Sequence, residues 1–154
     1  MRITRELTSE EVERRIKEFE KEYGMSFEKF KELFEAQKLD AKFVRSYSEW
    51  ADLVDTYKGY VEDGELDCIS EEIKDFKPEQ AALLTPKRIK LLYQLATMRV
   101  ESTNDLSQKV GRDVKNVHQD LTVLKRFGFV KLNKQKGIAL IPETLVKEIT
   151  FLIH

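Results

Sequence analysis

The sequence predicts a mainly α-helical fold that ends in a small β-hairpin. Apolar residues recur at helical spacing over much of residues 8–127, and Gly24, Gly111 and Gly128 each stand where such a segment ends. The segment VKLNKQKGIALI at 130–141 alternates apolar and polar residues around a turn, which is typical of a hairpin. A chain of 154 residues is long enough for one or two small domains with their own cores.

Three helices are expected in the first half of the chain. The first begins at Thr8, which can form a capping box with Glu11, and ends at Gly24. Its apolar side chains follow at spacings of four, three and four: Val12, Ile16, Phe19 and Tyr23. The second helix follows Ser26, and the third carries an apolar stripe. The members of that stripe are Tyr47, Trp50, Leu53, Val54 and Tyr57.

A weakly periodic, acidic segment over 59–78 is interpreted as a connector with a helical turn around Ser70 to Phe76. The domain boundary is expected near Lys77-Pro78, because the residue before proline disfavours helical geometry. The prediction is therefore an acidic helical region over 1–78 and a second domain over 79–154. Residues 1–80 hold 14 Lys+Arg against 22 Asp+Glu (−8), and residues 81–154 hold 13 against 6 (+7). Such asymmetry indicates either two different partners or uneven ion pairing within one body.

Three more helices are expected in the second half. Thr85-Pro86 is an N-cap followed by proline at the first helical position. The buried face of this helix is predicted to consist of Ile89, Leu92, Tyr93 and Ala96, broadened by Leu91 and Leu95. A second helix runs from the region of Ser102 to Gly111, and a third is capped by Asp113 and stopped by Gly128. The apolar seam of the third helix is predicted to be Val114, Val117, Leu121 and Leu124.

The hairpin follows directly after these three helices. The order helix, helix, helix, hairpin is that of a winged helix-turn-helix, in which the third helix presents its outer face to the major groove of DNA. The tail VKEITFLI also alternates, and it predicts a further strand or an oligomer contact. The fold class is therefore an N-terminal helical segment followed by a C-terminal winged helix-turn-helix.

With the seam inward, polar side chains of the third helix point outward. Asn and Gln can hold adenine through paired hydrogen bonds, Thr can meet a thymine methyl group, and Lys or Arg can contact phosphate or guanine. The predicted DNA-binding residues are Lys115, Asn116, His118, Gln119, Thr122, Lys125 and Arg126 on the helix, with Lys134 and Lys136 on the wing beside Lys131. The alternative is a solvated face on a protein-interaction module. Val123 fits solvent exposure poorly and is expected to pack against the wing or another subunit.

Residues 83–141 resemble the MarR-like winged-helix family of prokaryotic DNA-binding proteins. The resemblance lies in LLTPKRIKLLYQLA, GRDVKNVHQDL, VLKRFGFV and the NKQKG hairpin. It implies an antitoxin or regulator of a toxin–antitoxin pair, with DNA read by Lys115, Asn116, His118, Gln119 and Thr122. Relatives often carry Arg in place of Gln119 and Lys in place of Thr122, which implies greater dependence on dimerisation here. In the first half, YGMSFEKFKELF and SEWADL resemble helical segments of such antitoxins.

Two functions are thus expected from the sequence. The first is a homodimeric transcriptional regulator that binds double-stranded DNA sequence-specifically, as the autorepressing antitoxin of a cognate toxin. The alternative is an antidote whose acidic first half neutralises a partner protein, with the winged helix serving interaction. Its expected partner-binding residues belong to the apolar stripe of the third helix, which either packs into a small helical core or awaits a partner: Trp50, Leu53, Val54 and Tyr57.

Other classes of function have little support in the sequence. His118 and His154 are far apart, Cys68 is the single cysteine, and no catalytic or phosphate-binding motif occurs, so no enzyme, metal or cofactor is predicted. One cysteine excludes an internal disulfide and fits a reducing compartment. The start MRITRELTSEE lacks the apolar core of a signal peptide, so we expect a cytoplasmic protein without a membrane partner.

Overall fold

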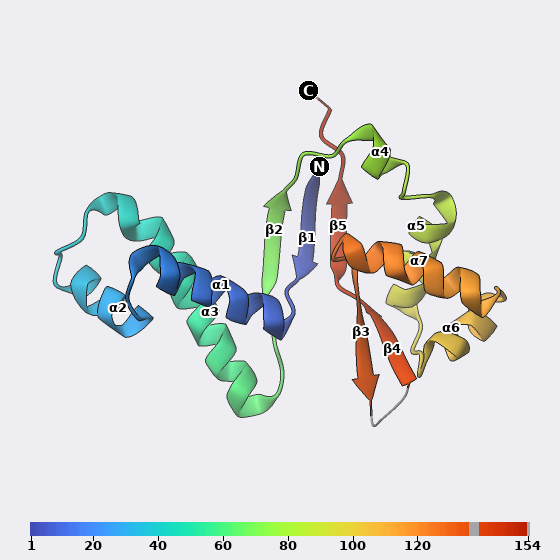
Figure 1. Ribbon diagram of the computed structural model, residues 1–154, viewed down its shortest axis with the longest axis horizontal. Coiled ribbons are helices and arrows are strands. Elements are labelled where there is room, and N and C mark those ends of the chain that lie inside the picture. The colour runs from blue at the N-terminus through green and yellow to red at the C-terminus, as the bar shows by residue number, and fades with distance from the viewer. Residues whose placement is uncertain (136–138, 154) are drawn as a thin grey trace. The chain divides into compact units, whose positions relative to one another are not determined.

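The computed structural model describes residues 1–135 and 139–153 and is mainly helical, with small antiparallel sheets (Figure 1). The chain forms two compact units. The larger unit contains Met1–Arg5 and Ser70–His154, and the smaller unit contains Glu6–Ile69. The smaller unit is thus inserted into the chain of the larger one. The sequence placed the boundary at 78/79 and did not anticipate that the first residues join the later part of the chain.

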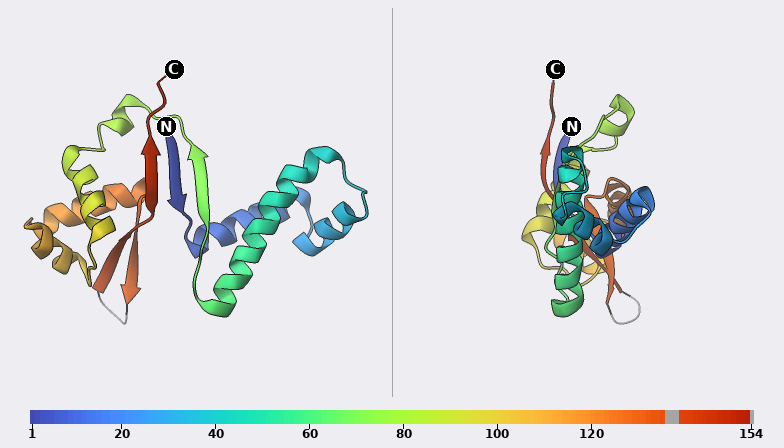
Figure 2. Two further views of the ribbon diagram at one scale, coloured as in Figure 1. Left: turned by 180° about the vertical axis from the view of Figure 1, so that it is seen from behind. Right: turned by 90° about the vertical axis from the view of Figure 1, so that its left-hand side faces the viewer.

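The smaller unit contains the three expected helices, α1 (Ser9–Tyr23), α2 (Phe27–Glu35) and α3 (Val44–Asp63), with a short 3-10 turn before α3. The capping box of Thr8 and Glu11 is present, and the Ser26 hydroxyl accepts a hydrogen bond from the backbone N–H of Lys29. Helices α1 and α3 lie side by side (Figures 1 and 2). The predicted starts of these helices are confirmed. They could be predicted because each cap depends on residues within one helical turn.

The core of the smaller unit is largely aromatic. Trp50 is fully buried and stacks on Phe19, with 5.4 Å between ring centroids. Phe30 is buried beside it, and Tyr23 donates a hydrogen bond to the hydroxyl of Ser46. Aromatic pairs at such separations add to the free energy gained by burying their surface. The aromatic stripe on α3 therefore stabilises the unit itself.

A three-stranded sheet of the larger unit joins both ends of the chain. Its strands are β1 (Arg2–Glu6), β2 (Ile69–Ile73) and β5 (Val146–Thr150), in the order β2-β1-β5. β1 pairs with β5 in antiparallel register, with Ile3 opposite Ile149. Ile3 is 1% exposed, so β1 belongs to the core of this unit. The strand expected in the tail is present up to Thr150.

The helical turn predicted around Ser70 to Phe76 is wrong, because Ile69–Ile73 forms β2. The backbone N–H of Lys74 donates to the carbonyl of Met1, and the N–H of Leu7 donates to the carbonyl of Cys68. Pairing with the start of the chain satisfies the backbone groups that a helix would otherwise pair locally. The prediction failed because a short segment was interpreted without its distant partner.

The rest of the larger unit follows the predicted order of helices and hairpin. After a short helix α4 (Pro78–Ala81) come α5 (Pro86–Thr97), α6 (Thr103–Val110) and α7 (Val114–Arg126). Strands β3 (Val130–Gln135) and β4 (Ala139–Thr144) are antiparallel neighbours, with Val130 opposite Thr144 (Figure 2). None of the helices described outside 136–138 and 154 is long and apolar enough to cross a membrane.

The core of the larger unit lies among α5, α6, α7 and the strands, and its fully buried side chains include Leu91, Leu106, Val117, Leu121, Leu124 and Phe129. On α5, Leu91, Leu92 and Leu95 are buried as expected. The predicted burial of Ile89, Tyr93 and Ala96 is wrong, since all three are exposed, Tyr93 by 73%. The roll of α5 directs its leucines into the core, and periodicity alone could not choose between two apolar faces.

Gly128, between α7 and β3, is required for two reasons. Its φ of +76° lies in the left-handed region, and an added Cβ would come 3.3 Å from Cζ of Arg5. The Arg5 guanidinium is buried and ion-paired with Glu72, so it has little room to move. Gly111 also has a left-handed φ, of +65°, but open space around it.

We predict that Gly128→Ala destabilises the protein more than Gly111→Ala. Left-handed geometry should cost each variant about 1–2 kcal/mol. The contact with Arg5 should add about 1 kcal/mol or more in Gly128→Ala alone. Urea unfolding of both variants measures the difference, and equal losses would show that the Arg5 contact relaxes freely.

Candidate nucleic-acid interface

The candidate interface is the outer face of α7, whose first turn is fixed by its cap. The carboxylate of Asp113 accepts hydrogen bonds from the backbone N–H groups of Lys115, at 2.9 Å, and Asn116, at 3.3 Å. At the other end the N–H of Phe129 donates to the carbonyl of Leu124, and both side chains are fully buried. The helix is therefore held at both ends, as the sequence predicted.

The inward side of α7 differs from the predicted seam. Val117, Leu121 and Leu124 are fully buried as expected. The prediction for Val114 is wrong: this side chain is 41% exposed at the first position of the helix. Asp120 lies on the inward side instead, with only 8% exposure. A carboxylate is therefore part of the packed face that orients the helix.

Asp120 connects three parts of the larger unit. One carboxylate oxygen accepts from Nε of Arg88 on α5 at 3.0 Å, and the other accepts from a terminal nitrogen of Arg112 at 2.6 Å. Arg112 belongs to the turn between α6 and α7, and Arg88 also donates to the carbonyl of Leu83 at 2.8 Å. Hydrogen bonds between charged groups are short, strong and directional. We call Asp120, Arg88 and Arg112 the Asp120 clamp.

The sequence did not identify the Asp120 clamp. A signal was present, because Asp120 stands three residues after Val117 and one before Leu121, on the same side of the helix. A charged residue at such a position is seldom buried without partners. The positions of Arg88 and Arg112 in sequence do not reveal that both contact this carboxylate.

Four of the predicted DNA-contacting residues share the outer face of α7. Lys115, Asn116, His118 and Gln119 are all exposed. Across the part of the chain that the structure describes, no hydrogen bond or ion pair holds their side-chain polar atoms. Their donors and acceptors therefore face solvent. Exposure of this kind is required for contact with a ligand and is equally found on a solvated helix face.

The remaining predicted positions on α7 fall into two groups. Lys125 and Arg126 are exposed in the last turn. Thr122 is partly buried, and its hydroxyl donates to the carbonyl of His118 at 2.9 Å. The Thr122 hydroxyl hydrogen is thus already used within the helix. Val123 is partly buried, as its apolar side chain led us to expect.

The lysines of the hairpin are not equivalent. Lys131 forms an ion pair with Glu143 on the adjacent strand, with 3.1 Å between Nζ and the carboxylate oxygen. Lys134 is exposed on β3. Lys136, also predicted to contact DNA, lies outside the described residues. Of the hairpin lysines that the structure describes, Lys134 is therefore the exposed one.

The charge asymmetry of the chain coincides with its two units. The smaller unit holds 10 Lys+Arg against 18 Asp+Glu, a net charge of −8. The larger unit holds 17 against 10, a net charge of +7. The outer face of α7 thus belongs to a basic body, which favours approach of a polyanion over long distances.

The predicted partner-binding stripe on α3 is largely part of the core. Trp50 is fully buried and Leu53 is 8% exposed. Val54 and Tyr57 are partly buried, and the Tyr57 hydroxyl donates to the carboxylate of Glu13 on α1. This hydrogen bond raises the pKa of Tyr57. Contact of a partner with Trp50 or Leu53 would require the smaller unit to open.

No cluster of His, Cys, Asp and Glu that could hold a metal ion occurs within residues 1–135 and 139–153. Cys68 is partly buried, and burial raises the pKa of its thiol. A raised pKa disfavours the reactive thiolate. Cys68 thus remains a thiol of low reactivity in this environment.

Comparison with known proteins gives one match. Residues 83–150 match a family model described as HVO_A0114. This range begins just before α5 and ends with the last residue of β5, and it covers less than half of the chain. No curated protein and no solved structure matches. The matched range contains the Asp120 clamp and the outer face of α7.

We predict that Asp120→Ala strongly destabilises the protein. Removing the carboxylate leaves the guanidinium groups of Arg88 and Arg112 together without their anion, which should cost about 3 kcal/mol or more in free energy of unfolding. The matched control is Asp75→Ala, which removes an exposed carboxylate of the same unit and should change stability by less than about 0.5 kcal/mol. Equal urea midpoints for the two variants would show that the clamp does not stabilise the fold.

Proposed function

We propose that residues 83–141 form a winged helix-turn-helix of the MarR-like type that binds double-stranded DNA, with α7 in the major groove. One observation carries the proposal: Lys115, Asn116, His118 and Gln119 are exposed together on a capped helix whose other side is fixed in a core. The positive charge of the larger unit also supports it.

The side chains on this face match the chemistry of base edges. Asn116 and Gln119 each present an amide that can pair with adenine, and each good bidentate contact discriminates by about 1–3 kcal/mol. Lys115 can reach guanine or phosphate. Lys125 and Arg126, with Lys134 and Lys136 on the hairpin, are the proposed phosphate contacts. Thr122 contributes a methyl group for thymine, because its hydroxyl is bonded within the helix.

Binding to an operator requires two copies. A single α7 offers few base contacts, whereas two copies related by a two-fold axis can read half-sites about 34–36 Å apart on one face of the duplex. The proposed protein is therefore a homodimeric transcriptional regulator that recognises a palindromic sequence.

The narrower form of the proposal is an autorepressing antitoxin. It rests on the resemblance to MarR-like antitoxins and on the acidic smaller unit, which is suited to a basic toxin. The alternative, an antidote that acts only through protein interaction, would use the exposed acidic surface of this unit, since Trp50 and Leu53 are buried. Equal affinity of the unaltered protein for all DNA sequences would favour that alternative.

We predict that replacing both Lys115 and Gln119 by alanine weakens binding to the DNA upstream of the protein's own gene by about tenfold or more. The loss of one phosphate-neutralising charge should also reduce the slope of log affinity against log salt by about one unit. Fluorescence anisotropy at several salt concentrations, with a scrambled duplex of equal length, measures both effects.

The matched control for charge is Lys17→Ala, which removes an exposed lysine from the smaller unit and should leave the preference for the upstream duplex intact. Circular dichroism checks that the double variant is folded. Equal affinity of the unaltered protein for the upstream and scrambled duplexes would contradict sequence-specific binding.

A further inference from the structure

The Asp120 clamp holds more positive than negative charge. The carboxylate of Asp120 lies 3.0 Å from Nε of Arg88 and 2.6 Å from a terminal nitrogen of Arg112. Within residues 1–135 and 139–153, no other carboxylate forms an ion pair with either guanidinium group. Two guanidinium groups therefore share a single carboxylate, and an anion is needed to balance the second positive charge.

The two arginines of the clamp differ in how their donors are used. Arg88 donates to Asp120 and to the carbonyl of Leu83 from different nitrogens, and its side chain is 13% exposed. Arg112 donates to Asp120 from one terminal nitrogen, and its side chain is 24% exposed. In the part of the chain that the structure describes, Nε and the other terminal nitrogen of Arg112 have no hydrogen-bond partner. Arg112 is therefore the more accessible of the two arginines and keeps donors for a further ligand.

Arg112 lies at the end of α7 that the proposed function places in the major groove. It precedes the N-cap Asp113, in the turn between α6 and α7. The first residues of a recognition helix contact the base edges, and the sugar-phosphate backbone borders the groove that they enter. The carboxylate of Asp113 already accepts from the backbone N–H groups of Lys115 and Asn116, which partly compensate its charge. A backbone phosphate can thus approach Arg112 at this end of the helix.

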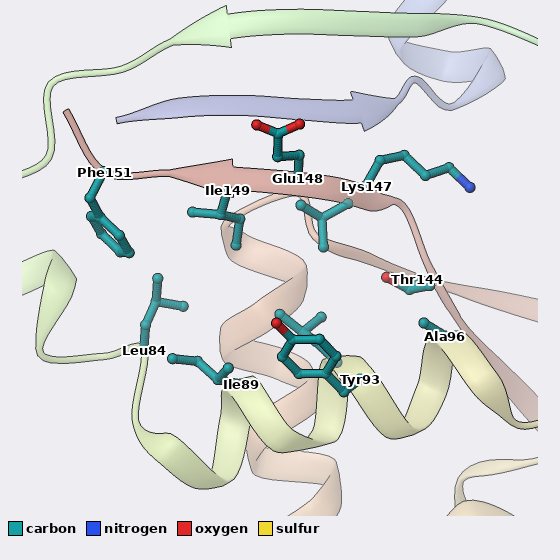
Figure 3. A pocket seen from close by; sticks show the side chains of 11 residues that line it. Leu84, Ile89, Tyr93, Ala96, Thr144, Lys147, Glu148, Ile149 and Phe151 are labelled. Carbon is teal, nitrogen blue, oxygen red and sulfur yellow. The ribbon is translucent and has the colours of Figure 1, made fainter.

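The apolar groove beside α5 has no comparable excess of positive charge. It has a volume of about 300 Å³ and lies between α5 and β5, where Ile89 and Tyr93 extend from the helix toward the strand (Figure 3). The charged residues among those that line it are Lys147 and Glu148, which have opposite signs. The excess positive charge near α5 is therefore at the clamp, on Arg88 and Arg112.

We propose that Arg112 binds a phosphate of the DNA backbone while Asp120 holds its guanidinium group in place. The guanidinium group is planar and carries five N–H donors, so it can face a carboxylate and a phosphate at the same time. A side chain that is already fixed loses less conformational freedom on binding than a mobile lysine does. The phosphate also supplies the negative charge that the clamp lacks. The inference rests on the proposed function, and it adds a contact that the sequence analysis did not include.

The test is the salt dependence of DNA binding by Arg112→Gln. Glutamine keeps an N–H donor for Asp120 and removes the positive charge. Affinity should fall by about tenfold or more for the upstream and the scrambled duplex alike, because a phosphate contact carries no sequence information. The slope of log affinity against log salt should decrease by about one unit for each copy bound. Fluorescence anisotropy of the full chain measures both quantities.

Arg88→Gln is the matched control, because it makes the same substitution in the other arginine of the clamp. Arg88 is less exposed and two of its nitrogens are bonded within the protein, so this variant should lose stability but keep the salt slope. Urea midpoints compare the stability of the variants, and circular dichroism shows that they are folded during the binding measurement.

Arg112→Lys separates the charge of the side chain from its shape. Lysine restores the positive charge without the planar set of donors, so it should recover the salt slope but only part of the affinity. The comparison of Arg112→Lys with Arg112→Gln tests the phosphate contact independently of any effect of Arg88→Gln on folding.

The outcomes separate this inference from the proposed function. An unchanged salt slope in Arg112→Gln, or equal reductions in Arg112→Gln and Arg88→Gln, would overturn the phosphate contact even if the protein prefers the upstream duplex. A reduced slope in Arg112→Gln, on a protein that binds both duplexes equally, would support the contact and contradict sequence-specific recognition. A chain that binds neither duplex would overturn both.

Discussion

The orientation of α7 depends on the carboxylate of Asp120. This carboxylate is buried on the apolar side of the helix. Burying a charge is costly unless it is paired, and here Arg88 and Arg112 supply that pairing from two different segments. Hydrophobic contacts are not directional, so an aliphatic seam alone would tolerate small rotations of the helix. Two charge-assisted hydrogen bonds that must form together leave much less freedom. The exposure of Lys115 and Gln119 follows from this constraint.

Much of the local structure could be predicted because its signals are local. The caps at Thr8, Ser26 and Thr85 depend on hydrogen bonds within one turn, which residue type and spacing indicate directly. The sheet could not be predicted in the same way. Met1 and Lys74 are hydrogen-bonded across 73 residues of sequence, and each strand is only five residues long. Short strands with distant partners carry little information in their own sequence.

The candidate site was predicted to a similar extent and for similar reasons. The exposed side chains of α7 followed from periodicity once Val117, Leu121 and Leu124 were placed inward. Hydropathy then favoured Val114 over Asp120 for the remaining inward position. The structure reverses that choice, because the pairing of Asp120 depends on arginines outside the helix. Apolar character also gave a wrong prediction of the buried face of α5. This helix has two apolar faces, and only one of them reaches the core.

Helix α5 connects the Asp120 clamp with the core of the larger unit through neighbouring residues. Arg88 holds Asp120, and Leu91 and Leu92, three and four residues later, are buried in that core. A helix moves as a nearly rigid body because each backbone hydrogen bond ties residues four apart. The packing of Leu91 and Leu92 therefore fixes the position of Arg88, and through it that of α7. In the proposed homodimer, the separation of the two α7 helices is the distance that a palindromic site must match.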